Sequence, residues 1–217
     1  MKLPPSVAPI VEKARKIIDQ DVIPLEKEML ARPFREMVPA LGALRAKVRD
    51  QGLWAPPMPT SYGGMGMSLL YFAHLSEVLG RSPLGHYVFN CQAPDIGNMG
   101  TLKAGSEEQK KQWLGPLTRG EIRSCFTADR ARAHQLEPRD SATAALDGDH
   151  YVVNGHKWFT SSADGAAFAI AMVITHPSAP SPYLREPSCR RARPGFASCE
   201  TSRSWAKREA TTRATPR

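Results

Sequence analysis

The stretch Gly105-Ser-Glu-Glu-Gln-Lys-Lys-Gln-Trp-Leu114 decides how this chain is organised. Ser106 suits the N-cap of a helix, because its hydroxyl can accept hydrogen bonds from the free amides of the first turn, and Gln109 occupies the capping-box position. The two glutamates between them complement the positive end of a helix. The stretch therefore predicts a short capped helix, which gives way to a strand at Ser124-Cys-Phe126.

Before this stretch, apolar residues recur at helical spacing, less regularly over residues 84–103. Four helical segments are expected, over residues 7–30 with a bend at Pro24, 37–48 closed by Gly52, 68–79 capped by Ser68 and ended by Gly80, and 84–103 broken near Pro94. The segment 56–68 is rich in Pro and Gly, which predicts an irregular connection. The first half of the chain therefore reads as wholly helical.

After Glu121 the chain changes to short β-rich runs over residues 122–127, 143–146, 151–153, 158–161 and 168–174. Asp147-Gly-Asp149 and Asn154-Gly155 are hairpin turn signals. The predicted class is α+β, with an all-α helical domain, an incomplete antiparallel β domain and a disordered, irregular basic tail. The corresponding ranges are 1–120, 121–180 and 181–217.

Composition excludes several classes of protein. The longest apolar run, 166–174, is too short to span a bilayer, and Met1-Lys-Leu-Pro-Pro5 lacks a signal core, so we expect no membrane span and a cytoplasmic location. The four cysteines have neither CxxC spacing nor regularly spaced ligand partners, so free thiols and no metal site are expected; they are Cys91, Cys125, Cys189 and Cys199.

The net charge of +8 belongs mainly to the tail, because residues 177–217 hold nine of the 29 Lys and Arg but three of the 21 Asp and Glu. Such basicity leaves open a non-enzymatic module that binds an anionic partner through the tail. Only Tyr183, Phe196 and Trp205 offer large rings there, so a stacking platform for nucleic acid is poorly supported and no nucleic-acid partner is expected.

Three motifs, in this order and spacing, resemble those of the acyl-CoA dehydrogenase family of flavoproteins. They are Tyr62-Gly-Gly-Met-Gly66, the stretch 105–126 and Asn154-Gly-His-Lys-Trp-Phe-Thr160. The resemblance covers roughly residues 5–126 and 143–180. Asn90-Cys-Gln-Ala-Pro-Asp95 is similar to the large, multidomain branch of that family.

The resemblance implies FAD as cofactor, a fatty acyl-CoA as substrate, an electron-transfer acceptor as partner, and homo-oligomeric full-length relatives. The implied reaction is α,β-dehydrogenation, in which a carboxylate takes the α-proton and the flavin takes the β-hydrogen as hydride. The implied cofactor-binding residues are Phe126, Thr127, Trp158 and Thr160. Trp158 and Thr160 would share one face of a strand, although a core tryptophan and an ordinary strand threonine explain the same pattern.

The resemblance implies no catalytic residue in this chain. It places the base in a C-terminal helical domain, and the chain stops near the expected end of the β domain, so we expect a truncated protein with little or no turnover. It also implies that Asp129 replaces a threonine beside the flavin, which predicts weakened cofactor binding, because a carboxylate replaces a hydroxyl donor near an anionic ligand.

Two segments, 128–142 and the tail from about 181, lack any periodicity. One hypothesis is that both segments are irregular or disordered loops. The other is that they were translated in a shifted reading frame, because allowed codons for residues 128–134, read one base later, can spell the family sequence Leu-Thr-Glu-Pro. Sequencing the coding DNA distinguishes the two hypotheses, since the shifted frames must then contain the family peptides.

Overall fold

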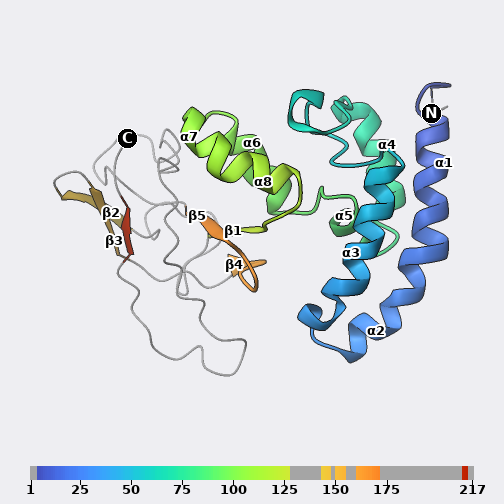
Figure 1. Ribbon diagram of the computed structural model, residues 1–217, viewed down its shortest axis with the longest axis horizontal. Coiled ribbons are helices and arrows are strands. Elements are labelled where there is room, and N and C mark those ends of the chain that lie inside the picture. The colour runs from blue at the N-terminus through green and yellow to red at the C-terminus, as the bar shows by residue number, and fades with distance from the viewer. Residues whose placement is uncertain (1–3, 128–142, 148–149, 155–159, 172–211, 215–217) are drawn as a thin grey trace. The chain divides into compact units, whose positions relative to one another are not determined.

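A computed structural model describes residues 4–127, 143–147, 150–154, 160–171 and 212–214 (Figure 1). The chain divides into two compact units, residues 1–96 and 97–217. The described part of the first unit is helical, whereas the second begins with helices and continues into two three-stranded sheets. A helix-rich N-terminal region followed by a small partial sheet confirms the predicted class. The predicted domain boundary at 120 remains a prediction, and it differs from the division into compact units.

The first predicted helix is present as one continuous helical path whose hydrogen-bond pattern changes along it. It consists of α1 (Ala8–Ile17), η1 (Ile18–Val22), η2 (Ile23–Leu25) and α2 (Glu26–Ala31). Pro24 lies in the 3₁₀ turn η2, where its missing N–H does not break an α-helical ladder. Figure 1 shows α2 turned away from the axis of α1 just after this point, as the sequence predicts.

The next two helices have the ends that the sequence predicts. Helix α3 (Phe34–Asp50) is followed by Gly52 at φ +71°, a left-handed conformation that glycine adopts without strain. Helix α4 (Leu69–Leu79) begins at Ser68, whose Oγ accepts from the backbone N–H of Tyr71 at 3.4 Å. Both predicted end signals are confirmed.

Between these helices the chain is irregular except for η3 (Thr60–Tyr62). The glycine motif beside η3 folds back on the preceding segment, and a Cβ on Gly64 would lie 2.3 Å from the Met58 carbonyl oxygen and 2.6 Å from that of Ala55. Gly63 has φ +80° but no neighbour within 4 Å of such a Cβ. The motif is therefore a tight turn in which Gly64 permits the close approach and Gly63 the reversal.

The predicted fourth helix is broken, as expected, into α5 (Gly85–Val88) and α6 (Asp95–Leu102), with a cis Ala93–Pro94 bond between them. One buried cation joins this region to α3. Arg45 is 8% exposed, lies between the rings of Trp54 and Tyr87, and donates to Asn90 Oδ1 at 2.9 Å. Such stacking suits the planar guanidinium group.

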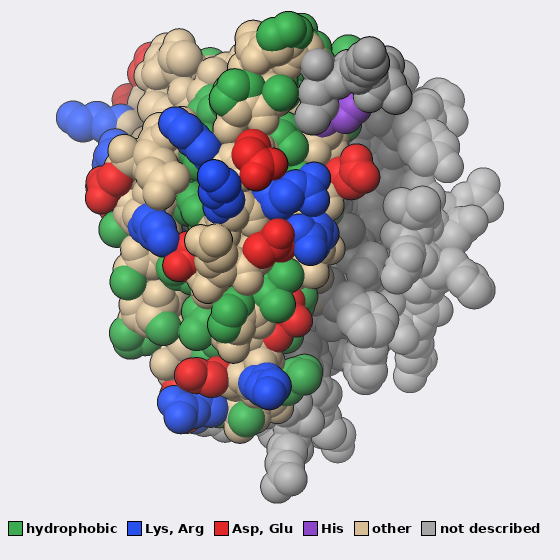
Figure 2. All heavy atoms as spheres, turned by 90° about the vertical axis from the view of Figure 1, so that its right-hand side faces the viewer, with side chains coloured by type: hydrophobic (Ala, Val, Ile, Leu, Met, Phe, Trp, Pro, Cys, Tyr) green, Lys and Arg blue, Asp and Glu red, His purple; other side chains and the backbone are tan. Residues whose placement is uncertain are grey.

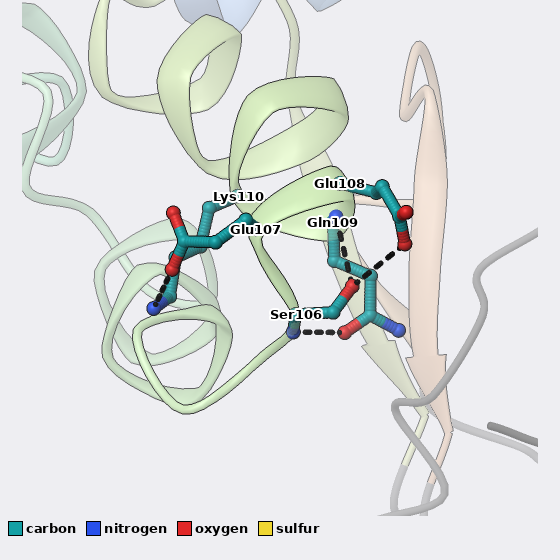
Figure 3. Close-up of polar contacts among 5 residues, drawn as sticks. All are labelled: Ser106, Glu107, Glu108, Gln109 and Lys110. Carbon is teal, nitrogen blue, oxygen red and sulfur yellow. Dashed lines mark hydrogen bonds and ion pairs between the residues drawn. The ribbon is translucent and has the colours of Figure 1, made fainter.

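The predicted capping box of the second unit is present (Figure 3). The Gln109 N–H donates to Ser106 Oγ at 3.3 Å, and the Ser106 N–H donates to Gln109 Oε1 at 3.0 Å. The helical stretch then runs through α7 (Glu107–Gln109), η4 (Lys110–Leu114) and α8 (Gly115–Thr118). The stretch that opened the sequence analysis is therefore a capped helix, as predicted.

The first sheet has the order β4-β1-β5 and comprises β1 (Ser124–Thr127), β4 (Thr160–Ser161) and β5 (Phe168–Ala171). Strands β1 and β4 are antiparallel, as predicted, but β1 and β5 are parallel. A parallel pair is possible here because about forty residues separate the two strands, enough for a crossover that returns in the same direction. Turn motifs in the sequence predict antiparallel pairs of neighbouring strands, so they do not predict the parallel pairing of β1 with β5.

The second sheet has the order β2-β3-β6 and is antiparallel; it comprises β2 (Thr143–Asp147), β3 (His150–Asn154) and β6 (Thr212–Ala214). Asp147 pairs with His150, which confirms the hairpin predicted there. Strand β6 lies in the segment predicted to be irregular, so that prediction is wrong for these three residues, which pair with β3. The remainder of the tail, the segment 128–142 and the turn at Gly155 lie outside the described residues.

Basic and acidic side chains are interleaved on the face of the molecule shown in Figure 2. The described surface also carries exposed ion pairs, among them Arg15–Glu12 and Arg81–Asp19. Within the described ranges, no helix is long and apolar enough to cross a membrane, and no cluster of His, Cys, Asp and Glu could hold a metal ion.

Candidate functional site

The β1–β4 pair brings together two of the predicted cofactor-binding residues. Thr127 stands directly opposite Thr160, and Phe126 stands opposite Ser161. Side chains directly opposite each other in a sheet lie on the same face, and neighbours along a strand lie on opposite faces. Thr127, which is 4% exposed, and the half-buried Thr160 therefore form a pair of hydroxyl groups on one face.

Strand β5 extends this face with small side chains. The register places Ala169 beside Cys125 and Ala171 beside Thr127. We call this surface the Thr127 face, defined by Cys125, Thr127, Thr160, Ala169 and Ala171. None of these side chains is larger than threonine, and Cys125 and Thr127 are almost fully buried.

The opposite face of the same sheet packs against the helices of the second unit. It carries Phe168, which is 1% exposed and whose ring lies 4.9 Å from that of Trp113 in η4. The side chain of Ser124 on this face accepts a hydrogen bond from Asn98 of α6 at 2.9 Å. The sheet therefore has one face that packs against helices and carries its large side chains together with two serines, and one face with no side chain larger than threonine.

The structure thus places only two of the four predicted site residues on the same face of the sheet. Thr127 and Thr160 share a face, whereas Phe126 belongs to the opposite face, so it could reach a ligand on the Thr127 face only through its backbone. Trp158 lies outside the described residues. The assignment of all four as cofactor contacts remains a prediction.

Sequence reasoning missed Ala169, Ala171 and Asn98 as parts of this region. The alternation Phe168-Ala-Ile-Ala171 could have revealed a strand with one small face, because its large residues occur at every second position. By contrast, the contact of Asn98 with β1 has no local signal, since it joins residues 26 and 27 positions apart.

The buried polar groups of the first unit offer no activated nucleophile in the described residues. Burial raises the pKa of Cys91 to about 12, although Arg45 acts in the opposite direction, so the thiol is protonated at neutral pH. His86 Nε2 lies 2.8 Å from Ser76 Oγ and joins α5 to α4, and partial burial lowers the pKa of this imidazole. We assign this pair a structural role.

Residues 7–121 match the family model described as "Acyl-CoA dehydrogenase, N-terminal domain". This match covers more than half of the 217 residues. The chain therefore belongs to the acyl-CoA dehydrogenase family, as its motifs predict.

Among curated proteins, the chain is similar to acyl-CoA dehydrogenase family member 10 of Mus musculus, with 35% identity over 82% of this chain and 18% of that protein. It is also similar to family member 11 of the same species, with 34% identity over 79% of this chain and 23% of that protein. The chain thus spans about a fifth of the length of these curated relatives.

Among solved structures, a putative acyl-CoA dehydrogenase from Mycobacterium abscessus aligns with a TM-score of 0.75 and 35% identity, covering 82% of this chain and 48% of that chain. An acyl-CoA dehydrogenase from Bacillus anthracis, solved as a complex with FAD, aligns with a TM-score of 0.64 and 24% identity over 79% of this chain and 30% of that chain. The second likeness supports the fold alone.

Proposed function

We propose that this chain contributes the flavin-binding part of an acyl-CoA dehydrogenase, with FAD held against the end of the β1–β4 pair. The observation that carries the proposal is the register in which Thr127 stands opposite Thr160 on a face of small side chains. A flat ring with a polar edge needs close approach to a sheet and hydroxyl groups at its border, and this face supplies both. The residues present therefore fit the flavin of FAD.

The chain's own residues would orient the ring and keep water away from it. When bound, FAD would accept a hydride from the β-carbon of a fatty acyl-CoA. The Thr127 and Thr160 hydroxyls would donate hydrogen bonds to the polar edge of the ring, and Trp158, two positions before Thr160, is proposed to pack on it. Water has little access to Thr127 and Cys125, which are almost fully buried, so a hydrogen bond from Thr127 would be stronger there than in water.

No carboxylate belongs to the Thr127 face among the residues that the structure describes. Removal of the α-proton needs a base near the flavin, and the side chains of this face are a thiol, two hydroxyls and two methyl groups. We therefore propose that these 217 residues alone show little or no turnover. Acyl-CoA-dependent bleaching of flavin bound to this chain would contradict that proposal.

The binding proposal is tested by titrating the purified chain with FAD and following flavin fluorescence. We expect Thr127→Val and Thr160→Val each to weaken binding about five- to tenfold, because each removes a hydroxyl proposed to donate to the flavin without changing the shape of the side chain. Ser161→Ala is the matched control, since this exposed hydroxyl lies on the opposite face of β4. Absence of FAD binding by the wild type, or an equal loss in the control, overturns the proposal.

The electron acceptor, the acyl-CoA substrate and homo-oligomeric assembly are proposed from the family alone. A second candidate function rests on the charge of the tail, where nine basic residues accompany three acidic ones. If the tail binds an anionic partner, deleting residues 177–217 will abolish a salt-dependent affinity for DNA. If the deletion leaves that affinity unchanged, the tail does not carry it.

A further inference from the structure

Asn98 of α6 holds the beginning of β1. Its side-chain nitrogen Nδ2 donates to Ser124 Oγ at 2.9 Å and to the backbone carbonyl of Cys125 at 3.1 Å. An amide nitrogen carries two hydrogens, so both bonds can form at once. Asn98 is 2% exposed, and both acceptor residues are fully buried. Asn98 therefore contacts the first two residues of the strand, which also pair with Phe168 and Ala169 of β5.

The position of this contact relative to the sheet gives it a specific consequence. Among the described residues, β4 pairs with β1 at Phe126 and Thr127, so the Cys125 carbonyl lies just before that pairing begins. A buried carbonyl must find a donor, and Asn98 provides one. The contact thereby fixes where β1 begins relative to α6, and Thr127 follows only two residues later.

We propose that Asn98 is a positioning residue for the flavin site, an inference that rests on the proposed function. Asn98 contacts the helix-covered face and the backbone of β1, not the Thr127 face. A shift of β1 by one residue would exchange its two faces and move Thr127 away from Thr160. Loss of the Asn98 amide therefore loosens the geometry of the hydroxyl pair as well as the fold.

The test compares Asn98→Leu with Thr118→Val. Both changes keep the number of heavy atoms and make a buried polar side chain of the second unit apolar; Asn98→Leu removes two hydrogen bonds and Thr118→Val removes one. Thr118 is 1% exposed, and its hydroxyl donates to the Leu114 carbonyl at 2.8 Å within its own helical stretch. Three quantities are measured on the full chain: the FAD dissociation constant, the visible spectrum of the bound flavin, and amide exchange at residues 125–127.

We expect Asn98→Leu to weaken FAD binding about tenfold, to shift the flavin absorption bands and to speed exchange in β1. We expect Thr118→Val to lower the denaturation midpoint while keeping the affinity and the spectrum of the wild type. Ser124→Ala, a milder change that leaves the Cys125 bond in place, should act in the same direction as Asn98→Leu with a smaller effect. It also serves as the test if Asn98→Leu fails to fold.

Two outcomes overturn the inference: FAD affinity that is unchanged in both the Asn98 and Ser124 variants, or an equal loss in Thr118→Val. A wild-type chain that binds no FAD overturns the proposed function instead. In that case amide exchange decides whether Asn98 positions β1. Faster exchange at residues 125–127 than in Thr118→Val supports that role, and equal exchange refutes it.

Discussion

The sequence specifies the secondary structure of the two compact units in different ways: by local signals in the first and by long-range strand pairing in the second. In the first, some helices carry their own end signals, such as Ser68 before α4 and Gly52 after α3. In the second, the central strand β1 pairs with residues more than thirty positions later, and its register depends on those partners. The comparison shows that local signals place the scaffold, whereas long-range pairing builds the candidate site.

The largest expected loss of stability comes from substitutions that create a cavity in the core of each unit. Leu75 of α4 and Leu117 of α8 are fully buried, so Leu75→Ala and Leu117→Ala should each cost about 2–5 kcal/mol of unfolding free energy. Amide exchange read separately over residues 4–96 and 97–127 should show each loss mainly in its own unit. Equal losses in both units from either change would mean that the two unfold as one.

The next effect concerns the glycine turn of the helical unit. Gly64→Ala should cost about 2–3 kcal/mol, because the new methyl group would overlap the backbone of Met58 and Ala55. Gly63→Ala is the matched control in the same turn and should cost only about 1 kcal/mol, since it meets no neighbour and strains only φ. Chemical denaturation measures both values. Similar costs would show that the turn relaxes around Gly64.

Helix caps allow a direct comparison between the units at smaller cost. Ser106→Ala should destabilise by about 1 kcal/mol, because it breaks the hydroxyl side of a reciprocal capping box. Ser68→Ala should cost less, since that hydroxyl makes a single long bond of 3.4 Å. Denaturation midpoints of the two variants test this order, and a larger loss at Ser68 would contradict it.

The smallest effect is a dependence on pH in the first unit. The pKa of His86 is lowered by partial burial, so the folded state binds fewer protons than the unfolded state just below pH 6.5. Stability should therefore be intact above this pH and decline as pH falls through the lowered pKa. Urea denaturation between pH 7 and 5 should show a shallower decline in His86→Gln. If His86→Gln and the wild type lose stability identically as the pH falls, groups other than His86 cause the loss.

Most of the helical scaffold was predictable because its signals are local. The capping box at Ser106, the cap at Ser68 and the break at Pro94 each depend on residues within one turn of the helix end. Arg45 shows the limit of such reasoning. An arginine within a helix is normally expected on the protein surface. The burial of Arg45 against the rings of Trp54 and Tyr87 depends on three segments that are separate in the sequence.

The candidate site was predictable only as a set of residue types. Family motifs predict Phe126, Thr127, Trp158 and Thr160 as cofactor contacts, and the register separates Phe126 from the two threonines. The parallel pairing of β1 with β5, which adds the small residues to the Thr127 face, leaves no signal at a turn. Strand β6 likewise forms from a segment whose composition predicts irregular structure.

The sequence by itself determined the family, the helix ends and the order of helical and β segments, because each depends on neighbouring residues or on motifs read in order. Tertiary structure decided which side chains share a sheet face and which helix holds β1. Those choices depend on contacts between distant residues, as Thr127 with Thr160 and Asn98 with Ser124 show. Side chains alternate along a strand, so register alone decides which of them face a ligand together.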